Sequence, residues 1–583
     1  MELLSDNEAI AQGAWEAGAS IGVGYPGTPS TETLEAFAKK DDVYAEWCPN
    51  EKVALEVGIG ASAAGKRVLA TMKHVGVNVA ADPLFTLAYT GVNGGLVLLA
   101  ADDPGMHSSQ NEQDSRFYAL AARIPSMDPS DSQEALDFTR NAYELSERFD
   151  LPVIIRSTVR ISHAKTPVET GKRMSYTLKP YEKDASKWVM MPAYAKGRRT
   201  SLDGRNDELK AYVNECPYNR IEMRDSDIGI ICSGAVYEYV RDALPHASVL
   251  KLGITWPLPE NILREFEEQV DTLYCIDEAS DYLSSQIKAL GINLADTPQA
   301  LPIAGELSAR AIALAFDSAV PTSYDAESNL PARPPALCAG CPHRLVFKEL
   351  SRARCIVTGD IGCYTLGALP PLSALDSTVC MGASISMAHG FELALENTEH
   401  APVVGVIGDS TFAHSGITSL LNTVYNQGSG TVCILDNRTT GMTGHQGNPV
   451  NGKTLQERIS RELNLEQLIE ALGVEHIQTV NPNDAQATRA AIKEAIEATD
   501  ALSVIIFRSP CVLLRDSFTP SAPYTVNASC TSCGACISLG CPALAKDPDT
   551  GAASIMADMC VGCGQCAQYC KFEAIEQTQG GLR

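Results

Sequence analysis

The sequence lacks the segments that send a chain to or through a membrane. No apolar stretch approaches the roughly 18 residues that span a bilayer, and the opening MELLSDNEAI lacks the basic segment and apolar core of a secretion signal. Basic residues are scarce as well: 46 Lys and Arg stand against 71 Asp and Glu, which gives a formal net charge of -25. Because phosphate binding requires clustered Lys and Arg, nucleic-acid and anionic-membrane partners are disfavoured. We expect a cytoplasmic protein.

The composition excludes disordered and fibrous proteins. Hydrophobic residues make up 45% and charged residues 20% of the 583 residues, which are ordinary values for globular domains. The length is about four times that of a usual domain of roughly 150 residues, so several independent cores are expected. No solenoid repeat is present. The sequence therefore predicts a soluble multidomain enzyme.

Short apolar strands alternate with helical segments along most of the chain, which is typical of open, mostly parallel α/β sheets. Strands are expected at 21–25, 67–71, 95–101 and 151–157. The predicted organisation is an α/β domain at 1–164, a connecting segment at 165–227, a second α/β domain at 228–317, a linker at 318–335, a third α/β domain at 336–515 and a small domain at 524–583.

The last domain is rich in cysteine. Eight of the 19 cysteines lie in the last 54 residues, and without a secretion signal they are expected to be reduced thiols. Two runs share the C-x2-C-x2-C spacing, at Cys530, Cys533 and Cys536 and at Cys560, Cys563 and Cys566. Three thiolates at this spacing suit three corners of an iron–sulfur cluster, and each run then needs a fourth ligand. Structural zinc, the alternative, favours two separated C-x2-C pairs.

The bacterial ferredoxin pattern takes the fourth ligand from the opposite run. Here Cys570 would complete the first cluster and Cys541 the second. The first run departs from the pattern, because four residues rather than three separate Cys536 from Cys541, and Lys571 stands where the second run would have proline. Since Cys541 serves the other cluster, the extra residue is tolerable. We predict two [4Fe-4S] clusters in the tail.

Two strands in the third α/β domain end in polar residues. VVGVIGDSTFAHSG (403–416) places Asp409 after one strand, and TVCIL (431–435) is followed by Asn437. Carboxyl ends of strands in open α/β sheets bind ligands, and carboxylate and amide oxygens suit Mg²⁺. A Gly-Asp turn after a strand more commonly only caps a helix. The continuation into LDNRTTGM resembles the thiamine-diphosphate fingerprint, which implies Asp409, Asn437 and the backbone carbonyl of Thr439 as magnesium ligands.

The first domain contains GVGYPG (22–27), which matches the dinucleotide-binding pattern G-x-G-x-x-G. That pattern requires a helix that begins within the glycines, with its amides directed at pyrophosphate. Pro26 and Pro29 remove two of these donors and delay the helix to Ser30 or Thr31, where a capped start is expected. The sequence therefore argues against NAD binding.

Thiamine chemistry requires a carboxylate that hydrogen-bonds to the aminopyrimidine ring. NEKVALEVGIGASAAG (50–65) supplies Glu51 at the start of a helix that is small and apolar enough to be buried. An acid in the first turn of any helix also complements the helix dipole, which is the ordinary interpretation. The thiamine-like third domain favours the catalytic role.

Several motifs occur in one order: YPGTPSTE (25–32), NEKVALEVGIGAS (50–62), RPPALCAGCPHR (333–344), GDIGCYTLG (359–367), GDS…LDNRTTGM and the double cysteine tail. Together they resemble the 2-oxoacid:ferredoxin oxidoreductases over essentially the whole chain, and most closely the large (alpha) subunits of the indolepyruvate branch. The resemblance implies a pyrimidine-binding domain first, a transketolase C-terminal-like domain second, a diphosphate-binding domain third and a 2[4Fe-4S] ferredoxin domain last. The two thiamine-binding domains are expected to be doubly wound.

The resemblance also assigns individual residues. Glu51 would activate thiamine diphosphate, and Thr28 would contact the carboxylate of the 2-oxo acid. The residues implied beside the cofactor are Gly359, Asp360, Gly362 and Gly408. A third [4Fe-4S] cluster is implied by Cys338, Cys341, Cys363 and Cys511; the alternative is a set of buried thiols. The other cysteines are assigned to packing.

The activity implied is the oxidative decarboxylation of an aryl 2-oxo acid, indolepyruvate first, with coenzyme A and with ferredoxin as the electron acceptor. A small beta subunit in an α2β2 assembly is implied as well, because one domain of the resembled enzymes is absent from this chain. Other 2-oxo acids, a non-oxidative thiamine decarboxylase and a non-catalytic electron-transfer subunit are the alternatives. Lys73, His74 and His445 lie in loops that could face the substrate, although a lone His is more often an ordinary core or surface residue.

Overall fold

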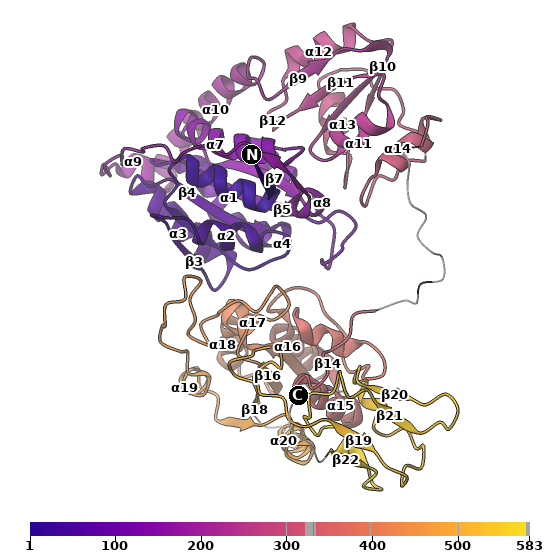
Figure 1. Cartoon of the computed structure of the whole chain (residues 1–583). Helices are drawn as coiled ribbons and strands as arrows, with labels where there is room; N and C mark the ends of the chain where they lie inside the picture. Colours follow the sequence, from indigo (N-terminus) through magenta and orange to yellow (C-terminus); the bar gives the residue numbers. More distant parts are fainter. Residues whose placement is uncertain (299, 321–329, 331–333, 397, 499–500, 579–583) are drawn as a thin grey trace. The chain divides into compact units, whose positions relative to one another are not determined.

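The computed structural model describes every residue except 299, 321–329, 331–333, 397, 499–500 and 579–583 (Figure 1). The chain divides into two compact units, Met1–Ala326 and Glu327–Arg583. Most of the predicted linker at 318–335 lies outside the described residues. The other predicted segment boundaries stay predictions.

A seven-stranded sheet forms the centre of the first domain, with the order β12-β6-β7-β5-β4-β2-β3. Its strands are β2 (Ile21–Gly24), β3 (Tyr44–Trp47), β4 (Val68–Lys73), β5 (Leu96–Asp102), β6 (Ser126–Met127), β7 (Val153–Thr158) and β12 (Ile254–Trp256). All neighbours are parallel except β12, which pairs antiparallel with β6. Every residue of β4, β5 and β7 is buried, as expected for a sheet covered on both faces. The four predicted strands are confirmed.

Helices follow the strands of this sheet. They are α1 (Asp6–Glu16), α2 (Thr31–Ala38), α3 (Glu51–Ala63), α4 (His74–Val79), α5 (Ala81–Thr90), α6 (Arg116–Ala122), α7 (Ser132–Phe149) and α8 (Val159–His163).

Helix α2 begins at Thr31, as predicted, but the predicted cap is wrong: the Ser30 hydroxyl donates to Gly27 O at 2.8 Å and makes no cap bond. The Ser30 hydroxyl is used within the turn after β2 and therefore does not cap α2.

Two glycines of GVGYPG allow neighbouring elements to pack closely against β2. A Cβ on Gly22 would lie 2.7 Å from the Phe37 ring, and one on Gly24 would lie 2.5 Å from the Thr71 hydroxyl. Helix α2 and strand β4 therefore approach β2 more closely than any side chain would allow. This packing gives the glycines a role that does not involve a dinucleotide.

The rest of the first unit contains a second, smaller sheet with the order β13-β10-β11-β9. Its strands are β9 (Arg220–Glu222), β10 (Asp225–Ser233), β11 (Ala247–Leu252) and β13 (Thr272–Cys275). Its helices are α11 (Val236–Ala243), α12 (Glu260–Glu268), α13 (Tyr282–Ala289) and α14 (Ala309–Ala315). The chain reaches this sheet through β8 (Lys165–Val168), which pairs with β1 (Glu2–Ser5), and through α9 (Ala185–Trp188) and α10 (Pro192–Val213).

The second unit is built on a parallel five-stranded sheet with the order β14-β15-β16-β18-β17. Its strands are β14 (Ile356–Thr358), β15 (Val403–Gly408), β16 (Gly430–Asp436), β17 (His476–Val480) and β18 (Leu502–Arg508). Its helices are α15 (His343–Ala353), η1 (Cys363–Ala368), α16 (Ala383–Leu395), α17 (Asp409–Thr411), η2 (Phe412–Gly416), α18 (Ile417–Tyr425), α19 (Leu465–Ala471) and α20 (Ala485–Glu497).

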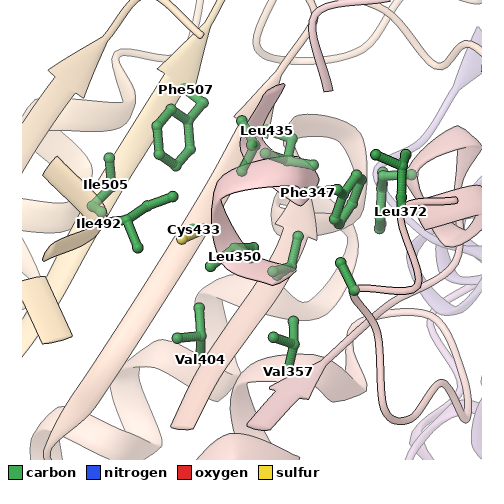
Figure 2. Close-up of a cluster of buried hydrophobic side chains, with 14 of the residues drawn as sticks. Phe347, Leu350, Val357, Leu372, Val404, Cys433, Leu435, Ile492, Ile505 and Phe507 are labelled. Carbon is green, nitrogen blue, oxygen red and sulfur yellow. The ribbon is translucent and has the colours of Figure 1, made fainter. Parts of the chain in front are cut away.

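Side chains alternate between two cores on the faces of this sheet. Cys433 and Leu435 enter one core, whereas Val432 and Ile434 enter the other. Figure 2 shows the first core, in which Phe347 of α15 packs near the sheet residues. Because both faces are covered, the predicted doubly wound form is confirmed for this domain.

The cysteine tail consists of two similar halves. The first half contains β19 (Tyr524–Val526), η3 (Ile537–Leu539) and β20 (Leu544–Lys546), and the second contains β21 (Ala553–Ile555), η4 (Ala567–Tyr569) and β22 (Ile575–Gln577). Strand β19 pairs with β22, and β20 pairs with β21, both antiparallel (Figure 1). This agrees with the duplicated sequence. In the described part of the chain, no helix combines the length and the apolar character needed to cross a membrane.

Candidate active site

Two loops and the end of a strand meet at the carboxyl edge of the first sheet. Thr28 lies in the loop after β2, Lys73 is the last residue of β4, and Ser108 lies in the loop after β5. A Cβ on Gly27 would stand 3.1 Å from the Lys73 Cβ, and the Ser108 hydroxyl lies 3.5 Å from Thr28 O. The edge where open α/β sheets bind ligands thus brings the predicted substrate residue Thr28 next to a lysine.

The Lys73 ammonium is buried, with 7% of the residue exposed. It donates to Ser108 O at 2.9 Å, and its Nζ lies 3.9 Å from Asp103 Oδ2. Burial lowers the pKa of Lys73 to about 8, and the Asp103 carboxylate opposes this shift. Asp103 also accepts hydrogen bonds from the backbone N–H groups of His107 and Ser108, so the loop holds the ammonium in place.

Glu51 begins α3, as predicted, after Asn50, whose side chain accepts from Val53 N at 2.9 Å. Glu51 is 6% exposed, and its Oε1 would lie 2.6 Å from a Cβ on Gly76 of α4. Gly76 therefore makes room for the carboxylate. Since α4 directly follows Lys73, the carboxylate packs beside the same strand end.

Helix α3 is not wholly buried, contrary to the prediction from its small apolar residues. Ala54, Leu55 and Gly58 are buried, whereas Glu56 and Val57 are exposed. Only one face of the helix packs against the sheet, because the period of an α-helix turns every third or fourth residue to the same side.

The second unit places Asp409 and Asn437 at the carboxyl ends of β15 and β16, which are neighbouring strands. Asp409, Asn437 and Thr439 are all buried. Asn437 Oδ1 accepts from Thr439 N at 3.2 Å, and Asn448 Nδ2 lies 3.5 Å from Asp409 Oδ2. Two side-chain oxygens from adjacent strand ends form the hard oxygen donor set that Mg²⁺ prefers.

Electrostatics at Asp409 favour a cation. Burial raises the pKa of Asp409 to about 8, and the neighbouring Asp436 carboxylate adds to the rise. A buried carboxylate is costly unless it is paired, and a divalent ion is a suitable partner. The residues present therefore fit the magnesium and diphosphate that the sequence predicts.

Asp360, whose place beside the cofactor stays a prediction, is a helix cap. Its carboxylate accepts from Gly382 N at 2.7 Å and from Ser384 N at 3.1 Å, so it caps the first turn of α16. Gly362 and Gly408 flank one ring, because a Cβ on either would lie 2.5 Å from Tyr364 Cε1. Gly359 donates from its N to Ser377 O at 2.7 Å.

Four cysteines from three separate segments of the chain lie near one another, and Cys363 and Cys511 lie beside Asn437. Cys511 N donates to Asn437 O at 3.0 Å, and a Cβ on Gly441 would lie 3.4 Å from Cys363 Sγ and 3.7 Å from Asn437 Nδ2. Burial raises the pKa of Cys363 to about 11, and Cys511 and Cys338 add to the rise. Cys341 is close enough to Cys338 and Cys363 for them to raise its pKa too.

The tail cysteines border two cavities. One, of about 600 Å³, is lined among others by Cys530, Cys533, Cys536, Cys541 and Cys570. The other, of about 20 Å³, is lined among others by Cys541, Cys560, Cys563 and Cys566. Cys570 thus lies with the first run, and Cys541 borders both. In the described residues, no group of three or more His, Cys, Asp or Glu side chains is arranged to hold a metal ion. The tail cysteines border the two cavities without that arrangement.

The histidines and the remaining cysteines lie as follows. His74 is buried in α4 with its Nε2 3.3 Å from Asn111 O, and burial lowers its pKa. His445 lies in the loop after Asn437, and its backbone N donates to Thr440 O. Cys380 is exposed, so its assignment to packing was wrong. The buried cysteines Cys48, Cys216, Cys232, Cys275 and Cys433 agree with that assignment.

Sequence reasoning missed three residues that hold this region together. Tyr364 OH donates to Ile361 O at 2.9 Å, and His343 Nε2 lies 3.4 Å from Asn437 Nδ2. Arg344 donates to the Cys338 carbonyl in the loop before α15 and to the Leu539 carbonyl in the tail. The motif RPPALCAGCPHR contains two of them, yet only its cysteines had a chemical interpretation.

Comparisons with known proteins agree with this geometry. Residues 12–206 match the family "Pyruvate flavodoxin/ferredoxin oxidoreductase, thiamine diP-bdg", and 360–507 match "Thiamine pyrophosphate enzyme, C-terminal TPP binding domain". Residues 553–576 match "4Fe-4S binding domain", which covers the second cysteine run.

Curated relatives match over nearly the whole chain. The indolepyruvate oxidoreductase subunit IorA of Archaeoglobus fulgidus is 39% identical over 99% of this chain and 97% of its own length. The IorA subunit of Thermococcus kodakarensis is 38% identical over the same shares. A solved 2-oxoglutarate:ferredoxin oxidoreductase from Magnetococcus marinus covers 54% of this chain and 64% of its own, at 16% identity and a TM-score of 0.46. The identity to the two IorA subunits over nearly the whole chain shows that this chain belongs to the 2-oxoacid:ferredoxin oxidoreductase family, among the indolepyruvate oxidoreductase IorA subunits.

Proposed function

We propose that this chain is the catalytic alpha subunit of an enzyme that oxidatively decarboxylates an aryl 2-oxo acid, with indolepyruvate as the expected substrate. The 2-oxo acid and coenzyme A become acyl-CoA and CO₂, and both electrons released pass to ferredoxin. One observation carries the proposal: Cys363 and Cys511 lie against the Asn437 loop. A non-oxidative decarboxylase has no use for the ligands of an electron-accepting cluster beside its cofactor site.

The residues that would hold thiamine diphosphate have separate tasks. Asp409, Asn437 and the Thr439 carbonyl would bind Mg²⁺ and thereby the diphosphate. Glu51 would accept a hydrogen bond from the aminopyrimidine ring and hold a proton there. When bound, thiamine diphosphate supplies a carbon nucleophile and an electron sink for the departure of CO₂.

The substrate carboxylate would lie at the carboxyl edge of the first sheet. Thr28 would donate a hydrogen bond to it, and the Lys73 ammonium would add a charge-assisted one. Among the described residues, the polar partners of this ammonium are Ser108 and, at 3.9 Å, the Asp103 carboxylate. Its low exposure makes the interaction stronger than it would be in water.

Replacing Lys73 with methionine should raise the KM for the 2-oxo acid about tenfold to a hundredfold, the cost of a hydrogen bond to a charged group. In the wild type, KM should also rise above pH 8, because the ammonium is present below its pKa of about 8 and is lost above it. Asp103 and His74 are the titratable neighbours. Steady-state kinetics from pH 6 to 9.5 would measure both effects.

Lys66→Met is the matched control, since Lys66 is exposed just before β4. It should leave KM unchanged at every pH. If Lys73→Met kept the wild-type KM and its pH profile, Lys73 would have no part in substrate binding.

Electrons would leave through iron–sulfur clusters. Cys338, Cys341, Cys363 and Cys511 would hold the cluster beside the cofactor. In the tail, one [4Fe-4S] cluster would bind Cys530, Cys533, Cys536 and Cys570, and the other Cys541, Cys560, Cys563 and Cys566. The cysteines that border each cavity support this division. Soft thiolate ligands suit iron and sulfide.

A panel of 2-oxo acids tests the function. The chain, co-purified with a small beta subunit as an α2β2 assembly, should reduce ferredoxin with indolepyruvate and coenzyme A, more slowly with phenylpyruvate, and least with pyruvate or 2-oxoglutarate. An aldehyde product that forms regardless of coenzyme A would instead identify a non-oxidative decarboxylase. Full activity of the alpha chain alone would refute the need for a beta subunit.

A further inference from the structure

Arg344 is a buried cation in the first turn of α15. The residue is 2% exposed, and its guanidinium donates to three backbone carbonyls: Leu539 O at 2.8 Å, Leu337 O at 2.7 Å and Cys338 O at 2.9 Å. Its Nε is buried and has no hydrogen-bond partner among the described residues. The side chain therefore joins the loop before α15 to the tail.

No carboxylate neutralises this guanidinium. Among the residues that the structure describes, none forms an ion pair with Arg344, although the exposed Arg352 on the same helix pairs with Glu349. A buried charge is costly unless it is paired, and neutral carbonyls compensate it only in part. Something anionic that the protein side chains do not supply is therefore needed near Arg344.

Arg344 lies next to two cysteine sets. It lines the small cavity together with Cys560 and Cys563, and it bonds to the carbonyl of Cys338. The guanidinium is thus adjacent to both cysteine sets.

The two cysteine loops touch each other. Gln565 Nε2 donates to Cys341 O at 3.2 Å and to Asn483 Oδ1 at 2.8 Å. A Cβ on Gly340 would lie only 2.4 Å from Val561 Cγ2. Arg344 therefore lies where the loop of one set packs on the loop of the other.

We infer that Arg344 is a shared counter-cation for two iron–sulfur clusters, the one held by Cys338, Cys341, Cys363 and Cys511 and the one held by Cys541, Cys560, Cys563 and Cys566. This inference rests on the cluster ligands of the proposed function. Four thiolates make each cluster anionic, and the reduced form has one more negative charge than the oxidised form. A fixed cation stabilises the reduced form more, so Arg344 raises both reduction potentials and favours the entry of electrons into these two clusters.

Arg344→Met should make both clusters harder to reduce. We expect the equilibrium constant for one-electron reduction of each to fall about tenfold, which corresponds to a midpoint potential lower by about 59 mV. Arg344→Lys keeps the charge and should remain closer to the wild type. The cluster of Cys530, Cys533, Cys536 and Cys570 should shift less, because Arg344 does not border its cavity.

The test is an EPR-monitored redox titration of the anaerobically purified full complex, with iron analysis of each variant. Arg352→Met is the control, since Arg352 lies on the same helix with 51% of its side chain exposed. Potentials that stay unchanged in Arg344→Met with full iron content would overturn the inference. Loss of iron in Arg344→Met but not in Arg344→Lys would support it, and equal loss in both would indicate a role of shape rather than charge and overturn it.

The proposed function can fail separately. If the wild-type complex holds no iron on these two cysteine sets, the cluster assignment is wrong whatever Arg344 does. If iron is present and the potentials do not move, only the role of Arg344 is wrong.

Discussion

Glutamine in place of Glu51 should lower the rate of 2-oxo acid decarboxylation by about 10²- to 10⁴-fold, the range that a positioned acid or base contributes. Glutamine has the same size as glutamate, so it should fill the space that Gly76 leaves beside Oε1. What the amide lacks is the negative charge that holds a proton on the aminopyrimidine. Single-turnover release of CO₂ measures this step without the later transfer of electrons.

The control for Glu51→Gln is Glu56→Gln on the same helix. Glu56 is exposed and forms an ion pair with Lys52, so its replacement should leave the rate unchanged. The thiamine diphosphate and iron contents of both variants should equal those of the wild type. An unimpaired rate in Glu51→Gln would show that Glu51 only complements the dipole of α3.

Serine in place of Cys541 should abolish the reduction of external ferredoxin. Cys541 borders the cavity of the second run, so the cluster held by Cys560, Cys563 and Cys566 would lose its fourth thiolate. The iron content should fall by about four atoms per chain, from about twelve if all three sets hold [4Fe-4S] clusters and from about eight if the third does not. Iron analysis together with EPR spectra measures the loss.

Cys380→Ser is the matched control for this prediction, because Cys380 is exposed and belongs to none of the three sets. It should keep full iron and full ferredoxin reduction. A Cys541→Ser variant that lost the signals of the first run and kept those of the second would contradict the exchange of ligands between the runs. The extra residue before Cys541 would then have another explanation.

The sequence alone predicted the features that depend on local pattern. Apolar runs identified β4, β5 and β7 because a strand covered on both faces is apolar throughout. Asp409 and Asn437 could be paired because carboxyl ends of neighbouring parallel strands meet at one edge. The two cysteine runs could be recognised as cluster ligands without knowledge of the fold, since the spacing of each run is contained within a few residues.

Only the tertiary structure decided what depends on packing between distant segments. The capping role of Asp360, the half-exposed α3 and the bond of Ser30 to Gly27 follow from neighbours that no local period specifies. The contact of Cys511 with Asn437 connects the segments that follow β18 and β16. No local pattern indicated a role for Arg344 in RPPALCAGCPHR. Folding buries it between two cysteine loops, where no described carboxylate pairs with it, and the cost of a buried charge depends on its surroundings rather than on its sequence.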